Sequence, residues 1–539
     1  MEPANLLFVL SDQHNRDTLG CYGHPTIQTP HLDALAARGV RFDAAYTNCP
    51  ICVPARASLA TGEYVHRIGY WDNAFPYDGR VRGWGHRLQE AGHRVDSIGK
   101  LHYRSVQDDD GFSDRIVPLN VVDGVGDVMG AIRDDPPIRS GMRGGVTEAG
   151  PGTSTYIDYD IEIADRSIEW LRNRSAEPDA PPWMLFCSFV CPHPPFIAPP
   201  DLFELYPPED IPLPVQNRRD EQPRHPALET LRRTMNYDGP FSEDQIRKVT
   251  AAYYGTCTHL DRQVGRVLEV LEQTGLAEST RIIYTSDHGE SMGRRGLWGK
   301  FTLYEESAAV PLILAGPDVP VGQSTSDPVT LVDCHPTILE AVGVEAESGD
   351  ADLPGRSLWS IAGGEPLGRA AFSEYHAVGT TCGSFMIRHG SHKYIHYVGE
   401  EPQLFDLAAD PFETIDLAHD PNSVGIRERM EALLAEILDP DEVDARAKAD
   451  QAALVSSHGG REAVLARGTF VNSPVPGEEP RFESGDGHQG DRRGDSHGGS
   501  RVAAPAAVPA GSRRGAGNVA GGTCLDAGGG ARLGFLTSL

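Results

Sequence analysis

Four short apolar runs in this sequence each end in a cluster of polar residues. The runs span residues 6–10, 93–98, 183–190 and 281–285. The clusters that follow them are, in order, Ser11-Asp12-Gln13-His14, Gly99-Lys100-Leu101-His102, Cys191-Pro192-His193-Pro194 and Ser286-Asp287-His288-Gly289. Short runs this apolar are typical of strands covered on both faces, as in a parallel sheet.

Helical patterns lie between these runs. Residues 31–38 and 157–172 carry apolar side chains at helical spacing. A longer helix is predicted to begin at Ser242, because Gln245 three residues later completes a capping box, and to end near Gly275. Alternating strands and helices predict an α/β fold with a doubly wound, mostly parallel sheet flanked by helices. Ligands bind beyond the carboxyl ends of such strands, so the four polar clusters are expected to converge.

The pattern changes near residue 370. Residues 371–376, 384–388, 393–397 and 403–407 are predicted strands separated by turns, and residues 426–438 are a predicted helix. We therefore expect a catalytic α/β domain over residues 1–370 and a smaller α+β domain with a small antiparallel sheet over residues 371–483. Residues 484–539 are rich in Gly, Ala, Arg and Ser and are predicted to be disordered. Residues 108–151 and 218–240 are predicted long loops that supply pocket residues, and residues 108–151 are expected to form either a lid or an interface arm.

Composition narrows the classes of partner. The formal charge of −29 over 539 residues argues against nucleic acid and anionic membranes, which both favour clustered basic residues. An anionic substrate must therefore be held locally, for which Arg56, Lys100 and Lys300 are the candidates. The sequence shows neither a secretory leader pattern nor an apolar stretch of roughly 18 residues, and its nine cysteines are scattered. We expect a cytoplasmic protein with reduced thiols and no membrane partner.

A further motif, Cys52-Val53-Pro54-Ala55-Arg56, is followed by Thr61-Gly62. Together with the polar clusters, and with Lys300 ahead of Tyr304-Glu305-Glu306-Ser307, it makes the chain resemble the sulfatase family of the alkaline-phosphatase-like superfamily. The resemblance runs from about residue 5 to about residue 482. The Asp-Gln and Asp-His pairs, with Tyr70-Trp71-Asp72-Asn73, are most similar to the choline-sulfatase and phosphonate-monoester-hydrolase branch. Cys49 and Cys52 also form a C-x-x-C pair, but the downstream motifs favour the sulfatase interpretation over a redox or zinc site.

The resemblance implies a chemistry for these residues. A formylglycine-generating enzyme would convert Cys52 to formylglycine, whose hydrate attacks the sulfur of a small-molecule sulfate ester. Cys52 should lie at the start of a short helix, expected over residues 55–61, whose amino end favours an anion. One divalent cation, Ca²⁺ or Mn²⁺, would be held by five residues: Asp12, Gln13, Cys52, Asp287 and His288. The imidazole and amide ligands shift the preference toward manganese.

The remaining candidate residues complete the implied site. Arg56 and Lys100 would hold the hydrate, and His102 would remove its second proton. His193 and Lys300 would bind the sulfate and protonate the leaving oxygen, and Asn73 would contact the substrate. Family members often form dimers or tetramers, so a homo-oligomer is expected.

Three functions remain open from the sequence. The first is sulfate monoester hydrolysis, and the second is hydrolysis of phosphonate monoesters or phosphate diesters on the same scaffold. Lys100 and His102 favour sulfate. The third, a catalytically inactive binding protein, is disfavoured by the intact set of candidate residues. An aromatic cage for a quaternary ammonium group is conceivable from Trp71, Trp84, Phe75 or Tyr103, but ordinary packing is the favoured interpretation of these side chains.

Overall fold

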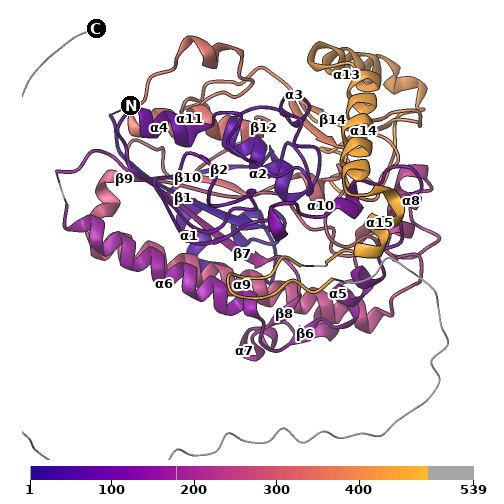
Figure 1. The fold of residues 1–539 in the computed structure, drawn as a ribbon, viewed down its shortest axis with the longest axis horizontal. Helices are drawn as coiled ribbons and strands as arrows, with labels where there is room; N and C mark the ends of the chain where they lie inside the picture. The colour runs from indigo at the N-terminus through magenta and orange to yellow at the C-terminus, as the bar shows by residue number, and fades with distance from the viewer. Residues whose placement is uncertain (1, 178, 471, 483–539) are drawn as a thin grey trace, which may run out of the picture. The chain divides into compact units, whose positions relative to one another are not determined.

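A computed structural model of the chain describes residues 2–177, 179–470 and 472–482. Its centre is an eight-stranded sheet with the strand order β11-β2-β10-β9-β1-β7-β4-β5 (Figure 1). The strands are β1 (Asn5–Asp12), β2 (Gly39–Phe42), β4 (Val95–Lys100), β5 (Asp114–Leu119), β7 (Met184–Pro192), β9 (Thr280–Ser286), β10 (Leu312–Ala315) and β11 (Gln323–Thr325). The tail predicted for residues 484–539 lies outside the described residues.

The four strands that carry the sequence motifs are neighbours at the centre of this sheet. β1 pairs in parallel with β7 and β9, and β4 pairs in parallel with β7 and β5. β10 runs antiparallel to both of its neighbours, so the sheet is mostly parallel. The predicted α/β fold class is confirmed, and all four polar clusters lie at the same edge of the sheet.

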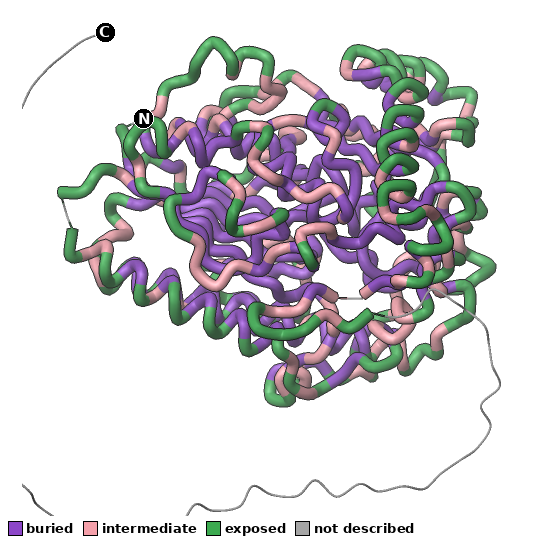
Figure 2. Tube along the Cα trace, in the orientation of Figure 1, coloured by how far each residue is buried: buried purple, intermediate pink, exposed green. Residues whose placement is uncertain are grey.

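Strand β1 shows why its sequence is apolar throughout. Leu6, Phe8 and Leu10 pack on one side with residues of α2 (Cys52–Thr61), α4 (Trp84–Glu90) and α11 (Cys334–Val342). Leu7 and Val9 pack on the other side with α1 (Pro30–Ala37), α6 (Thr155–Ser175) and α9 (Glu243–Gln273). The strands are buried between these two layers, as Figure 2 shows by colour. Both faces of β1 are covered from Leu6 to Leu10, which favours an apolar side chain at each of these positions.

The long predicted helix is α9, and its start confirms the capping box. The Ser242 hydroxyl accepts from the Gln245 N–H at 3.2 Å, and the Gln245 side chain accepts from the Ser242 N–H at 2.9 Å. These two bonds satisfy N–H groups that have no partner within the helix.

The second sheet is antiparallel, with the order β13-β14-β15-β16, as the pattern after residue 370 predicted. Its strands are β13 (Ala371–Tyr375), β14 (Ser384–His389), β15 (His392–Tyr397) and β16 (Gln403–Asp406). Helix α13 (Val424–Ile437) packs on β14, and α14 (Pro440–Ser457) and α15 (Gly460–Arg467) follow. Throughout the described ranges, the model contains no helix with the length and apolarity needed to span a bilayer.

Candidate active site

Helix α2 presents Cys52 and Arg56 to the carboxyl edge of the central sheet. It begins at Cys52, three residues earlier than expected, after Ile51 in an extended conformation. Pro54 fits the first turn because no intrahelical partner exists there for the N–H that proline lacks. The helix ends at Gly62, whose φ of 74° is left-handed. Every residue of α2 is buried, so its amino end faces the interior of the site.

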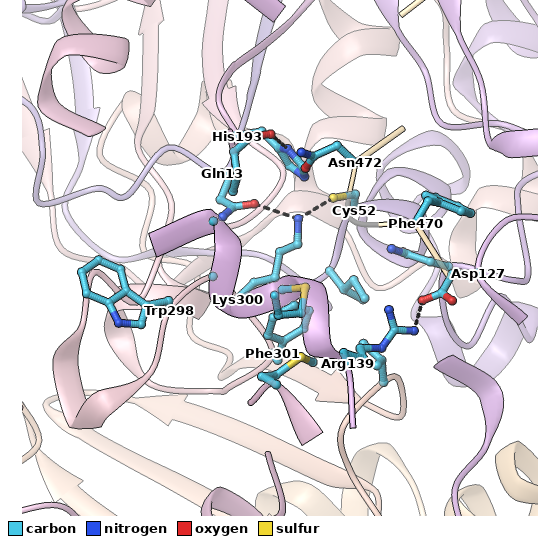
Figure 3. Close-up of a pocket in the computed structure, with 18 of the residues that line it drawn as sticks. Gln13, Cys52, Asp127, Arg139, His193, Trp298, Lys300, Phe301, Phe470 and Asn472 are labelled. Carbon is cyan, nitrogen blue, oxygen red and sulfur yellow. Dashed lines mark hydrogen bonds and ion pairs between the residues drawn. The ribbon is translucent and has the colours of Figure 1, made fainter. Parts of the chain in front are cut away.

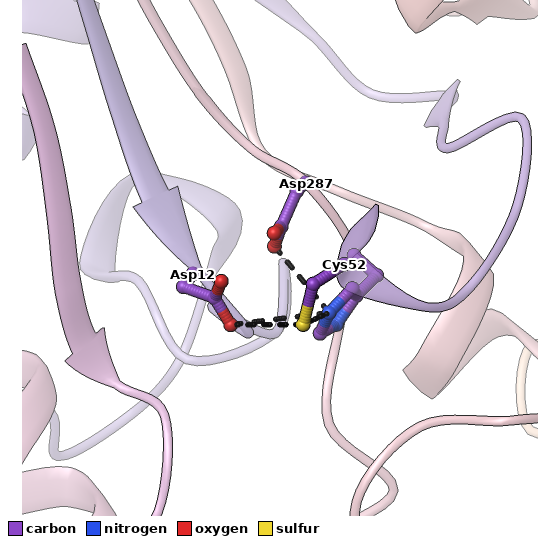
Figure 4. A group of neighbouring side chains, drawn as sticks. Asp12, Cys52 and Asp287 are labelled. Atoms are coloured by element: carbon purple, nitrogen blue, oxygen red, sulfur yellow. Dashed lines mark hydrogen bonds and ion pairs between the residues drawn. The ribbon is translucent and has the colours of Figure 1, made fainter. Parts of the chain in front are cut away.

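Four side chains that are distant in sequence converge at this edge (Figure 4). Ligand atoms of Asp12, Cys52, Asp287 and His288 all lie within 4.8 Å of one another, and all four residues are buried. The Cys52 Sγ lies 3.1 Å from His288 Nε2 and 3.7 Å from Asp12 Oδ1. The His288 Nδ1 contacts the Gly289 carbonyl at 3.1 Å. Because a carbonyl only accepts, Nδ1 carries a proton and Nε2 presents its lone pair to the cluster.

Three buried cations surround the two carboxylates. Arg56 Nη2 lies 3.0 Å from Asp12 Oδ2, and its Nε lies 2.8 Å from Asp287 Oδ2, so one guanidinium joins both acids. Arg56 Nη1 also donates to the Lys100 carbonyl and to the Ser188 hydroxyl.

The two lysines approach the cluster from different sides. Lys100 Nζ lies 2.8 Å from Asp12 Oδ2 as an ion pair, yet within the described chain it has no partner in hydrogen-bonding geometry. Lys300 Nζ donates to Gln13 Oε1 at 2.8 Å and lies 2.9 Å from Cys52 Sγ (Figure 3). An ammonium that is buried without its full set of acceptors is suited to an anionic ligand.

The surrounding charges give Asp12 and Asp287 different pKa values. Burial opposes ionisation of Asp12, but Lys100, His193 and Arg56 outweigh it and hold the pKa of this carboxyl well below its ordinary range. Burial and the adjacent Asp12 charge raise the pKa of Asp287 to about 6. A like-charged pair at this distance favours a cation between its members.

Gln13 is oriented by a residue that the sequence analysis missed. Its Nε2 donates to the buried Glu290 carboxylate, which also accepts from the Met292 and Gly299 N–H groups at 3.0 and 2.6 Å. The carboxylate can only accept, so the amide nitrogen must face it and Oε1 must face Lys300. Glu290 lies two residues after His288 in the sequence, and that adjacency was the only available signal.

The predicted residues His102, His193 and Asn73 line one pocket together with Cys52. His193 Nδ1 contacts the Pro194 carbonyl at 2.7 Å, which leaves Nε2 as the ring nitrogen for a ligand. Asn73 Oδ1 accepts from the Val53 N–H at 3.2 Å, at the amino end of α2. Burial, together with nearby Lys100, lowers the pKa of both histidines well below its usual value, so both imidazoles are neutral near pH 7. All eleven predicted site residues therefore lie in the cluster or in this pocket.

Many of the side chains that line the pocket are apolar or aromatic. They include Met142, Val146, Met235 and Tyr237. Trp298, Phe301 and Phe470 also belong to this lining (Figure 3). Several of these residues come from the two loops predicted to shape the pocket, 108–151 and 218–240.

The suggested aromatic cage is absent from this lining. Trp71 is fully buried and donates from Nε1 to Asp450 at 2.8 Å, and Trp84 and Tyr103 are packed in the core beside the sheet. Packing is therefore the correct interpretation of these rings, because α2, α4 and the second sheet cover them.

The donor set fits a divalent cation. Two carboxylates, one bare imidazole nitrogen and the Cys52 sulfur meet in a buried cluster, with the Gln13 amide oxygen beside Lys300. Mixed oxygen and nitrogen donors of this kind suit manganese as well as harder ions.

Comparisons with known proteins agree with this geometry. The sulfatase family model matches residues 4–344, more than half of the chain. The chain belongs to the sulfatase family. A second model, for the C-terminal part of N-sulphoglucosamine sulphohydrolase, matches residues 293–439. The sulfatase assignment makes the chain a hydrolase, and it agrees with the fold expected for the alkaline-phosphatase-like superfamily.

Individual relatives include a choline-sulfatase and a phosphonate monoester hydrolase, the two kinds of enzyme that the motifs indicated. A choline-sulfatase of Rhizobium meliloti (strain 1021) is 32% identical over 438 residues, covering 77% of this chain and 83% of the relative. Arylsulfatase K of Danio rerio is 30% identical over 433 residues, covering 77% and 80%. The crystal structure of a phosphonate monoester hydrolase of Agrobacterium radiobacter matches with a TM-score of 0.65 at 26% identity, covering 81% of this chain and 96% of that one.

Proposed function

We propose that this sulfatase hydrolyses small-molecule sulfate monoesters through a formylglycine hydrate formed from Cys52. The observation that carries the proposal is the position of the Cys52 side chain. Its sulfur lies 2.9 Å from Lys300 Nζ and 3.1 Å from His288 Nε2, at the bottom of a pocket and at the amino end of α2. An oxygen nucleophile on this carbon would face the cations that favour a sulfate group.

The surrounding side chains support distinct roles in two steps. In the first step one hydrate hydroxyl attacks sulfur and the alcohol leaves, with Lys300 and His193 binding the sulfate oxygens and supplying a proton to the leaving oxygen. In the second step the other hydroxyl loses its proton to His102, its oxygen forms the aldehyde double bond, and sulfate departs with the electron pair of the broken carbon–oxygen bond. Arg56 and Lys100 hold the hydrate, and Asn73 contacts the substrate.

Asp12, Gln13, Asp287 and His288, with residue 52, would hold one divalent ion. Such an ion lowers the pKa of a hydroxyl that it binds and screens the charge of the ester. Calcium and manganese both suit this donor set.

The runner-up is hydrolysis of phosphonate monoesters or phosphate diesters. It is favoured by one observation, the structural match to a phosphonate monoester hydrolase over 81% of this chain. The choline-sulfatase and arylsulfatase K relatives both carry sulfatase names, which favours sulfate.

A substrate panel on protein with quantified conversion of Cys52 tests the proposal. The fraction of aldehyde in the peptide that contains Cys52 is measured by mass spectrometry. Turnover of an aryl sulfate, an aryl phosphonate monoester and an aryl phosphate diester is then compared per converted site. We expect the sulfate to be fastest, and Cys52→Ala to abolish turnover. Fastest turnover of the phosphonate would replace the proposal by the runner-up, and full activity of thiol-only protein would remove the nucleophile.

The cytoplasmic location, the dimeric or tetrameric assembly and the domain boundaries at 370 and 483 stay predictions. Sedimentation of the purified full-length chain would test the assembly.

A further inference from the structure

Residues that follow α15 line the active-site pocket. Four of them line or brace the pocket, namely Thr469, Phe470, Asn472 and Ser473, and we call these four the C-terminal strap. The strap lies more than 360 residues after His102 in the sequence, and no sequence motif marks it.

The strap is held at both ends by buried hydrogen bonds. At one end the Thr469 hydroxyl accepts from Arg139 Nη1 and donates to Asp127 Oδ1, each at 3.0 Å. At the other end the Tyr156 hydroxyl donates to the Ser473 carbonyl at 2.5 Å. A segment fixed at two points places its side chains with little freedom, which is the condition for positioning another group.

The Ser473 hydroxyl meets the candidate base directly. Its Oγ lies 3.0 Å from His102 Nε2, and both residues are buried. The other ring nitrogen, Nδ1, is buried and has no hydrogen-bond partner among the described residues. His102 itself has a left-handed φ of 55°, which is uncommon for a residue other than glycine.

These contacts determine which tautomer of the His102 ring is favoured. A neutral imidazole carries one proton, and the nitrogen without it accepts. If Nε2–H donates to Ser473 Oγ, Nδ1 is left as a bare acceptor with no donor among the residues that the structure describes. The opposite tautomer would leave a buried N–H without any acceptor, which is the less favourable arrangement.

We propose that Ser473 is a positioning residue that holds the His102 ring with its proton on Nε2, so that Nδ1 is the atom that removes the second proton of the hydrate. The inference rests on the proposed function for its catalytic meaning, but the tautomer belongs to the resting protein. In the second step the proton of the remaining hydroxyl passes to Nδ1, the carbon–oxygen double bond forms, and the bond to sulfate breaks. The Ser473 hydroxyl then stabilises the imidazolium by accepting from Nε2–H.

The tautomer is measured first, on unconverted protein in which Cys52 is still a thiol. Full-length chain with 15N-labelled histidine gives the chemical shifts of both ring nitrogens, and loss of one pair in His102→Gln assigns it. In the parent we expect Nε2 to be protonated and Nδ1 to be bare. In Ser473→Ala the two chemical shifts should converge. Ser473→Thr should restore the parent values. Ser326→Ala, which removes an exposed hydroxyl, is the matched control. A proton on Nδ1 in the parent, or an unchanged spectrum in Ser473→Ala, would overturn the proposal.

Kinetics on converted protein test the consequence. With an aryl sulfate, kcat/KM reports steps up to alcohol release, whereas kcat also includes the second step. We expect Ser473→Ala to lower kcat by about 10- to 100-fold, leave kcat/KM unchanged, and release one alcohol per converted site in an initial burst. Mass spectrometry of the quenched protein should then find sulfate on the peptide that contains residue 52.

The outcomes separate the two proposals. Equal losses in kcat and kcat/KM without a burst would mean that Ser473 only supports the pocket, and would overturn the positioning role. No alcohol release by the fully converted parent would instead refute the proposed function, whatever tautomer His102 has. Tyr156→Phe, which keeps the Ser473 hydroxyl but removes a bond to its carbonyl, should give a smaller loss of the same kind.

Discussion

At the scale of single residues, Arg56 determines how Asp12 and Asp287 can share a buried site. Its fork reaches both carboxylates and also the Lys100 carbonyl, with every partner in the interior. A lysine carries the same charge but presents one point and cannot reach both acids at once. The fixed position of arginine in the Cys-x-Pro-x-Arg motif therefore has a structural reason beside the catalytic one.

We expect Arg56→Lys to lower the free energy of unfolding by about 2–3 kcal/mol, because charge-assisted hydrogen bonds to buried acids are lost. Urea denaturation of the unconverted protein in a chelator measures this without involving catalysis. Arg262→Lys is the control, since Arg262 pairs with Asp201 at the surface with side chains 51% and 69% exposed. The control should change stability by less than about 1 kcal/mol. Equal effects of both substitutions would contradict the bridging role.

Glu290 acts on the cluster through Gln13. Glu290→Gln places an amide where three N–H groups now donate, so the Gln13 amide should turn and withdraw its oxygen from the site. We expect manganese affinity, measured by calorimetric titration of metal-free protein, to fall about 10- to 100-fold. The exposed Glu278→Gln is the control. Unchanged affinity would show that Gln13 is no ligand.

At the scale of elements, the site depends on where strands and one helix stop. β1, β4, β7 and β9 end at one edge of the sheet, and α2 begins there. The other end of α2 is limited by Gly62, where an added Cβ would lie 2.7 Å from the His335 side chain. Movement of this end shifts Cys52 and Arg56 together, because they share the helix.

We therefore expect Gly62→Ala to cost more stability than Gly92→Ala. Both glycines have a left-handed φ, 74° and 86°, and share a backbone penalty of about 1–2 kcal/mol. Only at Gly62 does the new methyl group meet a neighbour, since nothing lies within 4 Å at Gly92. Thermal and urea unfolding of both variants gives the difference. Equal losses would mean that His335 moves aside freely.

At the scale of the whole molecule, the second sheet is tied to the catalytic layers by buried polar groups. Glu374 on β13 lies 3.0 Å from His66 Nδ1, which follows α2 in the chain, and 2.9 Å from His376 Nε2. Burial opposes ionisation of Glu374, but His66 and His376 outweigh it and lower its pKa to about 2.

The contacts of Glu374 with the two histidines make the free energy of unfolding depend on pH in the acid range. A carboxyl with a depressed pKa stabilises the fold above its unfolded pKa of about 4.5, and the contribution is lost as pH falls toward 2. We expect Glu374→Gln to remove about 3 kcal/mol at pH 7 and to flatten the dependence of unfolding free energy on pH between these values. Urea titrations at several pH values, with the exposed Glu365→Gln as control, measure the slope. If the free energy of unfolding changed equally with pH in Glu374→Gln and in the parent, the lowered pKa of Glu374 would not be the cause of this dependence.

The local sequence pattern was sufficient to predict the central sheet and the residues of the inner site. The central parallel strands are mainly apolar because both of their faces are covered, so the polar cluster after an apolar run indicates the end of the strand, as at Asp12 and Asp287. The capping box at Ser242 is equally local. These features depend on neighbouring residues in the chain, and a single sequence therefore contains them.

Only the tertiary structure decided the outer part of the site. Glu290 orients Gln13, Tyr237 and Trp298 line the pocket, and Ser473 meets His102 across more than 360 residues of chain. A serine or tryptophan has no local pattern that separates packing from contact with a ligand. Which of them faces the pocket depends on how loops and the C-terminal strap cross the sheet edge, and that crossing is set by long-range packing.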